Sequence, residues 1–253
     1  MNDLVSIILP VYNIEKYIRE TLDCILSQTF QYWELEITDD CSTDGTAEII
    51  KEYANKDSRI HYWRLENNSG AGVARNNSIG KSRGRYIAFI DSDDWWYPTK
   101  LEEQLKFMQE NKYEFTCTYY EDANEKLETY YMMRQPAKMS FYDMKSGCSV
   151  GTPGVIIDVL RIGKRYMPAL RRAEDWGLWL EVLRCVDYLY TYPKALWKYR
   201  HISGSETSNK WKLMKAVVVM YKLVLGMNPV SAWFYCICVF LPKNILKKLR
   251  KKL

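Results

Sequence analysis

Residues 85–94 read RYIAFIDSDD, an apolar run that ends in three carboxylates within four residues, Asp91, Asp93 and Asp94. The aromatic and β-branched residues of this run predict a buried strand. Three neighbouring carboxylates repel one another unless a cation lies between them, and hard oxygen ligands suit Mg²⁺ or Mn²⁺. Because ligands of an open α/β sheet bind beyond the carboxyl ends of its strands, the stretch indicates a metal site. The alternative is an acidic turn that caps the following helix.

A second strand with an acidic end lies upstream. ELEIT (34–38) alternates like a strand and runs into DDCSTDGT (39–46), whose turn and N-cap residues precede helical spacing over 46–54. Further strands are expected at 5–9 and 60–65, and further helices at 14–28 and from about 74 to 84. Strands that alternate with helices predict a parallel sheet with right-handed crossovers. The sequence contains no GxGxxG or GxxxxGK[ST] motif, so a dehydrogenase or P-loop protein is not indicated.

Five segments of the chain match a known family in order and spacing. They are VSIILPVYN (5–13), LSQTF (26–30), DDCSTDGT (39–46), ARNNSIGKSRGRYIAFIDSDD (74–94) and EDWGLWL (174–180). Together they resemble glycosyltransferase family 2, of the bacterial surface-polysaccharide type, over about residues 4–205. The resemblance implies the GT-A fold, a three-layer α/β/α sandwich with a mostly parallel central sheet. Residues 1–94 would then bind the nucleotide sugar and 95–209 the acceptor, with 210–253 as a helical extension.

The same resemblance assigns the nucleotide site. Asp40 would accept the uracil N3–H, while Asp39 either assists or only holds the turn. Pro10, Val11 and Tyr12 would line the uridine pocket. Asp91 would face the ribose or a metal-bound water, with Ser92 beside it in the nucleotide set. Arg75 would orient these acids or the diphosphate.

The resemblance also implies a bound Mn²⁺ or Mg²⁺. Asp93 would be its principal ligand, joined by Asp91 and His201, and the ion would neutralise the departing diphosphate. Related sequences usually have one residue between the Arg and the His of this region, whereas Arg200 and His201 are adjacent here. His201 is therefore either a ligand or a surface histidine, and Asp94 is either a ligand or a helix cap.

The catalytic base falls on the segment that begins at Glu174. By resemblance Asp175 is the base and Glu174 orients it or contacts the acceptor. Both acids also suit a helix N-terminus through its dipole, so their position alone does not prove catalysis. Among the tryptophans, Trp96 and Trp176 are the expected acceptor contacts, although helical spacing of Trp176 and Trp179 suits a core as well.

Charge divides the chain at residue 209. The net charge of +5 is the sum of −5 for residues 1–209 and +10 for 210–253, which contain no acidic residue. Residues 223–241 are uncharged, but Asn228-Pro229 is an expected break between two helices. A basic, aromatic-bearing helix pair on an anionic leaflet is the favoured interpretation, with a membrane span or a soluble dimerising pair as alternatives. Nucleic-acid binding is not expected, because bulky aliphatic residues separate the basic ones.

The seven scattered cysteines form no CxxC pair and suit a reducing cytoplasm. We expect no signal peptide, because a core strand follows Asp3 directly. The combined prediction is an inverting, metal-dependent transfer from a UDP-sugar to a lipid-linked saccharide at the inner face of the cytoplasmic membrane. The alternatives are a non-catalytic nucleotide-sugar scaffold and a nucleotidyltransferase, which would need a basic, Gly-rich phosphate loop near the N-terminus. The transferred sugar is not determined.

Overall fold

The computed structural model describes residues 3–202 and 210–242. Its strands are β1 (Val5–Val11), β2 (Trp33–Asp39), β3 (Ile60–Arg64), β4 (Tyr86–Phe89), β5 (Trp95–Trp96), β6 (Phe115–Ala123), β7 (Thr129–Met133), β8 (Lys138–Met139), β9 (Ile156–Asp158) and β10 (Leu189–Arg200). Its α-helices are α1 (Ile18–Leu26), α2 (Thr46–Ala54), α3 (Ala71–Lys81), α4 (Lys100–Asn111), α5 (Phe141–Lys145), α6 (Val159–Ile162), α7 (Glu174–Val182), α8 (Lys210–Leu225) and α9 (Pro229–Tyr235). A 3₁₀ turn spans Thr152–Gly154 and a π-helical turn spans Cys236–Phe240.

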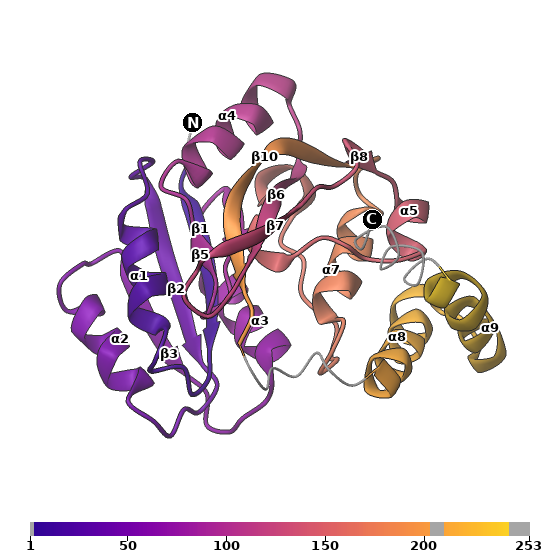
Figure 1. Ribbon diagram of the computed structural model, residues 1–253, viewed down its shortest axis with the longest axis horizontal. Helices are drawn as coiled ribbons and strands as arrows, with labels where there is room; N and C mark the ends of the chain where they lie inside the picture. The colour runs from indigo at the N-terminus through magenta and orange to yellow at the C-terminus, as the bar shows by residue number, and fades with distance from the viewer. Residues whose placement is uncertain (1–2, 203–209, 243–253) are drawn as a thin grey trace.

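The strands form one sheet in the order β3-β2-β1-β4-β9-β6-β10-β5 (Figure 1). The first four of these run parallel, which confirms the predicted α/β class and parallel core. Beyond β4 the sheet becomes mixed, because β9 is antiparallel to both of its neighbours, β4 and β6. Parallel strands end at the same edge of a sheet, so the acidic stretches that follow β2 and β4 lie at one edge.

Two hydrophobic cores cover the two faces of the sheet. Strand β1 is buried along its whole length, and its alternating side chains serve both cores: Ile8 faces one, whereas Ile7 and Leu9 face the other. Helices α1, α2 and α4 contribute to the core around Ile7, and α3, α7 and α8 to the core around Ile8. This arrangement explains why the strand reads as a nearly continuous apolar run. The predicted three layers are therefore present.

The basic C-terminal segment packs onto the second of these cores. Side chains of α8, α9 and the π-helical turn are buried in it, namely Val217, Val218, Met220, Tyr221, Val224, Ala232, Cys236 and Phe240. Figure 1 shows α8 and α9 side by side, at the end of the molecule away from α1 and α2. The change of charge at residue 209 is thus not a boundary between separate cores. The expected helix break is present, with Asn228 capping α9 by accepting from the Ser231 N–H.

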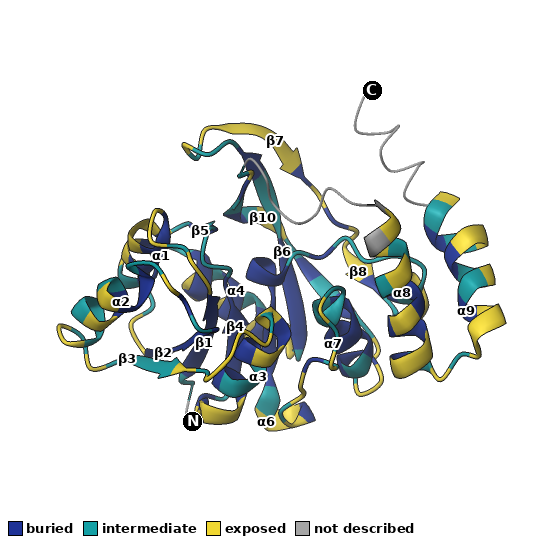
Figure 2. Cartoon of the chain, turned by 90° about the horizontal axis from the view of Figure 1, so that it is seen from below, coloured by how far each residue is buried: buried dark blue, intermediate teal, exposed yellow. Residues whose placement is uncertain are grey.

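The outer side of this segment is exposed in Figure 2. Trp211, Val219 and Leu223 are exposed on α8, and Val230 and Phe234 on α9. Within the described residues, no helix is both long enough and apolar enough to cross a bilayer. The basic cluster that the sequence places after residue 242 lies outside the described residues.

Candidate active site

A buried arginine joins the acidic strand end to the predicted base segment. Arg75, on α3, lies 2.5 Å through Nη2 from Asp91 Oδ1 and 3.2 Å through Nη1 from Glu174 Oε1. Burial lowers the pKa of Arg75, but Asp91 and Glu174 raise it by more, so the guanidinium stays charged. Residues 75, 91 and 174 come from three separate elements. The structure thus brings together acids that are far apart in sequence around one fixed cation.

Asp175 lies beside this cluster, in the first turn of α7. Its Oδ1 accepts from the Trp176 N–H at 2.7 Å, and its Oδ2 lies 3.4 Å from the Thr152 hydroxyl. Burial and the neighbouring Glu174 raise the pKa of Asp175 to about 6, against the opposing effect of Arg75. Asp175 is therefore ionised at neutral pH yet basic enough to accept a proton from a hydroxyl that is losing it.

The loop that carries the other two aspartates is fastened by β10. Arg200 donates from its backbone N–H to Asp94 Oδ1 at 3.0 Å and from Nε to the Asp93 carbonyl at 2.8 Å. Burial and Asp91 raise the pKa of Asp93 to about 6, while burial and Asp93 raise that of Asp94 well above its ordinary value. Asp94 Oδ2 is buried with no partner in the described chain. Of the two roles left open for Asp94, that of capping the next helix is not observed, because Thr99 occupies the N-cap of α4.

The three predicted metal ligands do not converge in this structure. Among the described residues, Asp91, Asp93 and His201 are not a group whose ligand atoms lie within 4.8 Å of one another. His201 Nε2 instead lies 2.9 Å from Asp122 Oδ1, on the neighbouring strand β6. Asp91 and Asp93 nevertheless fit a hard divalent ion, since Mg²⁺ is commonly held by one or two carboxylates together with substrate phosphates. Their mutual repulsion, which contributes to the raised pKa of Asp93, is what a cation would relieve.

Another group of possible metal ligands does have its ligand atoms close together, elsewhere on the sheet, and it was not anticipated from the sequence. Glu34 and Glu36 share one face of β2, and His61 lies opposite on β3. Glu36 already accepts from His61 Nδ1 and Trp63 Nε1, both at 2.7 Å, and Glu34 accepts from Arg83. Protein donors thus satisfy this group, and we assign it a structural role.

The predicted nucleotide residues meet at the end of β1 and β2. Val11 pairs with Asp39 in the sheet, and Tyr12 is exposed beside them. Pro10, one residue earlier on β1, is buried. Asp39 holds the turn, because its oxygens accept from the Ser42 N–H and the Tyr62 hydroxyl, each at 2.7 Å.

Asp40 binds the loop that precedes α3. Its Oδ1 accepts from the Ser69 N–H and its Oδ2 from the Gly70 N–H, each at 2.7 Å. A carboxylate has about four acceptor positions, so two remain for a ligand. Ser92, near the acidic strand end, accepts through its carbonyl from the Thr21 hydroxyl at 3.0 Å.

The two tryptophans expected to contact the acceptor are buried, so that prediction is wrong. Trp96 is fully enclosed, donates to the Pro153 carbonyl at 3.0 Å and carries Lys100 Nζ 3.9 Å from its ring centroid. Trp176 donates to the Met144 carbonyl at 2.8 Å and packs against Phe240. Neither ring presents a free face on which a sugar could stack.

One cavity of about 360 Å³ contains the acidic cluster. Residues 75, 91, 174 and 175 line it, together with others that the sequence did not single out: Thr152, Arg171, Arg172, Trp197, Tyr199 and Leu213. The sequence signal available for the arginines was their position one residue before the EDW segment. Leu213 carried no such signal, because it belongs to α8, about forty residues further along the chain.

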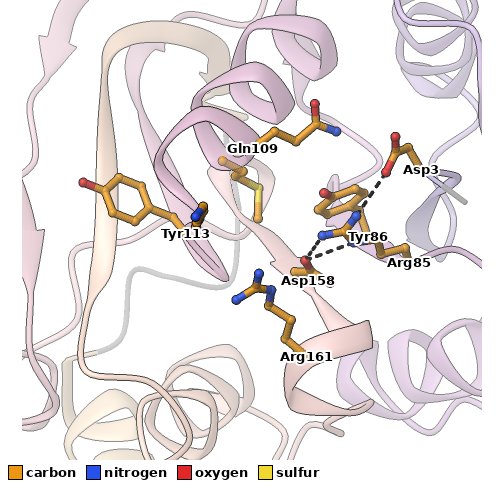
Figure 3. A pocket seen from close by; sticks show the side chains of 9 residues that line it. Asp3, Arg85, Tyr86, Gln109, Tyr113, Asp158 and Arg161 are labelled. Carbon is orange, nitrogen blue, oxygen red and sulfur yellow. Dashed lines mark hydrogen bonds and ion pairs between the residues drawn. The ribbon is translucent and has the colours of Figure 1, made fainter. Parts of the chain in front are cut away.

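Figure 3 shows a different hollow, of about 290 Å³, at the other end of β4. Arg85 lies there between Asp158, at 2.7 Å, and Asp3, at 3.2 Å. Arg85 precedes β4 whereas Asp91 follows it, so this hollow and the acidic cluster lie at opposite edges of the sheet. Its paired charges join the N-terminal segment to β9.

Comparison with known proteins gives consistent matches. The family model "Glycosyl transferase family 2" matches residues 6–167. The chain is 38% identical to a putative teichuronic acid biosynthesis glycosyltransferase of Bacillus subtilis, TuaG, over 97% of each chain. It is 34% identical to the Escherichia coli UDP-Glc:alpha-D-GlcNAc-diphosphoundecaprenol beta-1,3-glucosyltransferase WfaP, over 94% of this chain and 92% of the relative. The structure of S. aureus TarS 1–349 in complex with UDP-GlcNAc shares the fold, with a TM-score of 0.69 at 23% identity, over 94% of this chain and 71% of that one.

Proposed function

Because the chain belongs to glycosyltransferase family 2, we propose that it transfers a sugar, with inversion, from a UDP-sugar to a lipid-linked saccharide. A relative named for surface-polysaccharide biosynthesis and a solved structure that shares the GT-A fold support this proposal. The observation that carries this proposal is the fixed arrangement of Asp91, Arg75, Glu174 and Asp175 around one cavity. The acids that follow β4 would serve the donor, and the acids of α7 would serve the acceptor.

The proposed reaction is a single displacement. Asp175 removes the proton from the acceptor hydroxyl as that oxygen forms a bond to the anomeric carbon of the donor. The bond from this carbon to the diphosphate breaks at the same time, and UDP leaves with the electron pair. The relative WfaP, whose name gives UDP-Glc as donor and a beta-1,3 linkage as product, supports inversion, since the sugar of UDP-Glc is α-linked.

The side chains around the donor have separate roles in this proposal. Asp91 and Asp93 would hold a divalent cation, which would supply Lewis-acid stabilisation of the departing diphosphate. Asp40 would use its remaining acceptor capacity for the uracil N3–H. Asp39 holds the turn beside it. Arg75 holds Asp91 and Glu174 in place by hydrogen bonds within the protein, so neither substrate is needed to position these two acids.

The C-terminal helices support docking on the inner face of a membrane. Val230 is 79% exposed and Phe234 65% exposed, one helical turn apart on α9. Trp211 is 65% exposed on α8, and residues 210–253 contain ten basic residues and no acidic one. Exposed apolar groups with basic neighbours favour the interface of an anionic leaflet. Phe240 takes no part in this surface, because it is buried against Trp176.

The direct test is donor turnover. Purified protein with Mn²⁺ or Mg²⁺, a panel of UDP-sugars and a diphosphate-linked saccharide acceptor should release UDP and extend the acceptor. Asp175→Asn should lower kcat by about 10³-fold or more while leaving UDP affinity within about twofold, because the base acts only in the transition state. Full turnover by this variant would show that Asp175 is not the catalytic base. Binding of UDP-sugar without any turnover by the wild type would favour the non-catalytic scaffold.

Metal dependence has its own test. Asp93→Asn should raise the Mn²⁺ concentration for half-maximal activity by at least about tenfold, equivalent to about 1.4 kcal/mol. The matched control is Asp158→Asn, a buried aspartate at the opposite edge of the sheet, which should leave the metal titration unchanged. An unchanged titration for Asp93→Asn would exclude it as a principal ligand.

A further inference from the structure

We propose that Arg171, with Arg172 beside it, binds the diphosphate of the lipid-linked acceptor at the mouth of the catalytic cavity. This inference rests on the proposed function and specifies how its acceptor is recognised. It assigns a residue set outside the matched sequence segments, and it places the acceptor between α7 and α8.

The local backbone holds these arginines at the cavity. They end the loop that leads into α7, directly before Ala173, which adopts a left-handed conformation with φ 59°. This loop packs closely on the first turn of α3: a Cβ at Gly72 would lie 3.5 Å from the Leu170 carbonyl, and one at Gly70 would lie 4.0 Å from Arg171 Cγ. The stem of Arg171 is therefore supported by α3 while its guanidinium remains exposed.

The charges of the cavity leave Arg171 for a ligand. Arg75 is committed to Asp91 and Glu174. Arg171 makes no hydrogen bond or ion pair with any described residue, although three carboxylates line the same cavity. An arginine fork suits phosphate oxygens because it donates two parallel hydrogen bonds.

The apolar lining of the same cavity favours the diphosphate of the lipid-linked acceptor over that of the UDP-sugar donor. Leu213, from α8, is 39% exposed and lines the cavity with both arginines. Trp211, in the same helix, does not line the cavity and is 65% exposed. The cavity is thus lined by the proposed base, by two arginines and by an apolar residue of α8. A lipid-linked saccharide carries a sugar, a diphosphate and a hydrocarbon, which these three kinds of residue would suit, whereas a nucleotide sugar has no hydrocarbon.

The experiment compares two acceptors that carry the same sugar, one on a short prenyl diphosphate and one on a neutral octyl group. Arg171→Ala should raise KM for the diphosphate acceptor by about 10- to 100-fold. It should leave KM for the octyl glycoside and for the UDP-sugar within about twofold. Arg171→Lys should recover part of the loss, because it keeps the charge but not the fork. Arg165→Ala is the matched control, since Arg165 is an exposed arginine of the same loop that lies against Cys185 and does not line the cavity.

A binding measurement gives a readout without turnover. Farnesyl diphosphate should bind the wild-type protein at least about tenfold more tightly than Arg171→Ala, and farnesol should bind both equally. Equal KM changes for both acceptors, or a raised KM for the UDP-sugar, would overturn the inference and assign Arg171 to the donor. Turnover with no preference for the diphosphate acceptor would overturn it while the proposed function stands. If no donor were consumed with any acceptor, the proposed function would fail. In that case, equal affinities of the wild type and Arg171→Ala for farnesyl diphosphate would separately reject the arginine site.

Discussion

Arg75 and Arg85 show why burial and ion pairing do not by themselves indicate catalysis. Each is a mostly buried arginine held between two carboxylates. Arg85 joins the N-terminal segment to β9 at the edge of the sheet where strands begin. Arg75 lies at the edge where parallel strands end, beside a carboxylate whose pKa is raised to about 6. What separates the Arg85 ion pairs from those of the proposed active site is thus their position in the sheet.

This comparison leads to a prediction about pH. Asp175 must be ionised to act as a base, so kcat/KM of the wild type should fall as the pH drops below about 6. Arg75→Ala removes a charge that lowers the pKa of Asp175, so the acid limb of the pH profile should move to higher pH. Arg85→Ala should lower the Tm without moving that limb. An acid limb that stays in place in Arg75→Ala would show that Arg75 does not tune the base.

At the scale of elements, the contact between α3 and α7 helps to position Glu174, one of the two proposed active-site acids of α7. The sequence predicts a helix from about residue 74, whereas α3 already begins at Ala71, so Gly72 is helical. A Cβ at Gly72 would lie 3.1 Å from Glu174 Cγ, which is tighter than an ordinary contact. The small residues at the start of α3 therefore serve the close approach of two helices rather than a flexible loop.

Two glycines of α3 give a matched test of this contact. Gly72→Ala should displace Glu174 from Arg75 and lower kcat by about tenfold, which corresponds to about 1.4 kcal/mol in the transition state. Gly80→Ala, in the same helix but with nothing within 4 Å of the added Cβ, should raise the free energy of unfolding by about 0.5–1 kcal/mol and leave kcat unchanged. Equal kcat values for the two variants would contradict a role for the contact.

At the scale of the whole molecule, the C-terminal helices are both core and surface. Tyr221 is fully buried and its hydroxyl donates to the Lys145 carbonyl at 2.9 Å, while Val217 and Val224 pack in the same cluster. Deleting 210–253 would expose this cluster and cost several kcal/mol, at about 1.5–3 kcal/mol for each large apolar side chain. Deletion therefore cannot distinguish membrane binding from stability, and substitutions on the exposed side are needed.

The triple substitution Val230→Ser, Phe234→Ser and Ile237→Ser tests that surface. All three side chains are more than half exposed, so the Tm should change little. Flotation with anionic liposomes should fall by at least about tenfold in affinity, because the apolar groups that enter the interface are lost. Leu160→Ser, an equally exposed apolar residue on α6, should float like the wild type. Undiminished flotation of the triple variant would move the membrane contact away from α9.

The fold class and part of the cavity could be predicted from sequence because local patterns carry them. Apolar runs such as 86–90 are buried on both faces of the sheet, and parallel strands deliver the acids that follow them to one edge. The positions of Asp91 and Asp175 around one cavity follow from that topology and from the family's motif order.

Only the tertiary structure decided what covers each side chain. The sequence does not decide whether Trp96 and Trp176 are exposed or buried. In the structure the Thr152–Gly154 turn covers Trp96, and Tyr221 and Phe240 of the C-terminal segment cover Trp176. His201 lies against Asp122 because β10 pairs with β6. Arg171 and Leu213 share one cavity although about forty residues separate them. Burial and partnership depend on elements that pack from distant parts of the chain, and a local pattern does not contain that information.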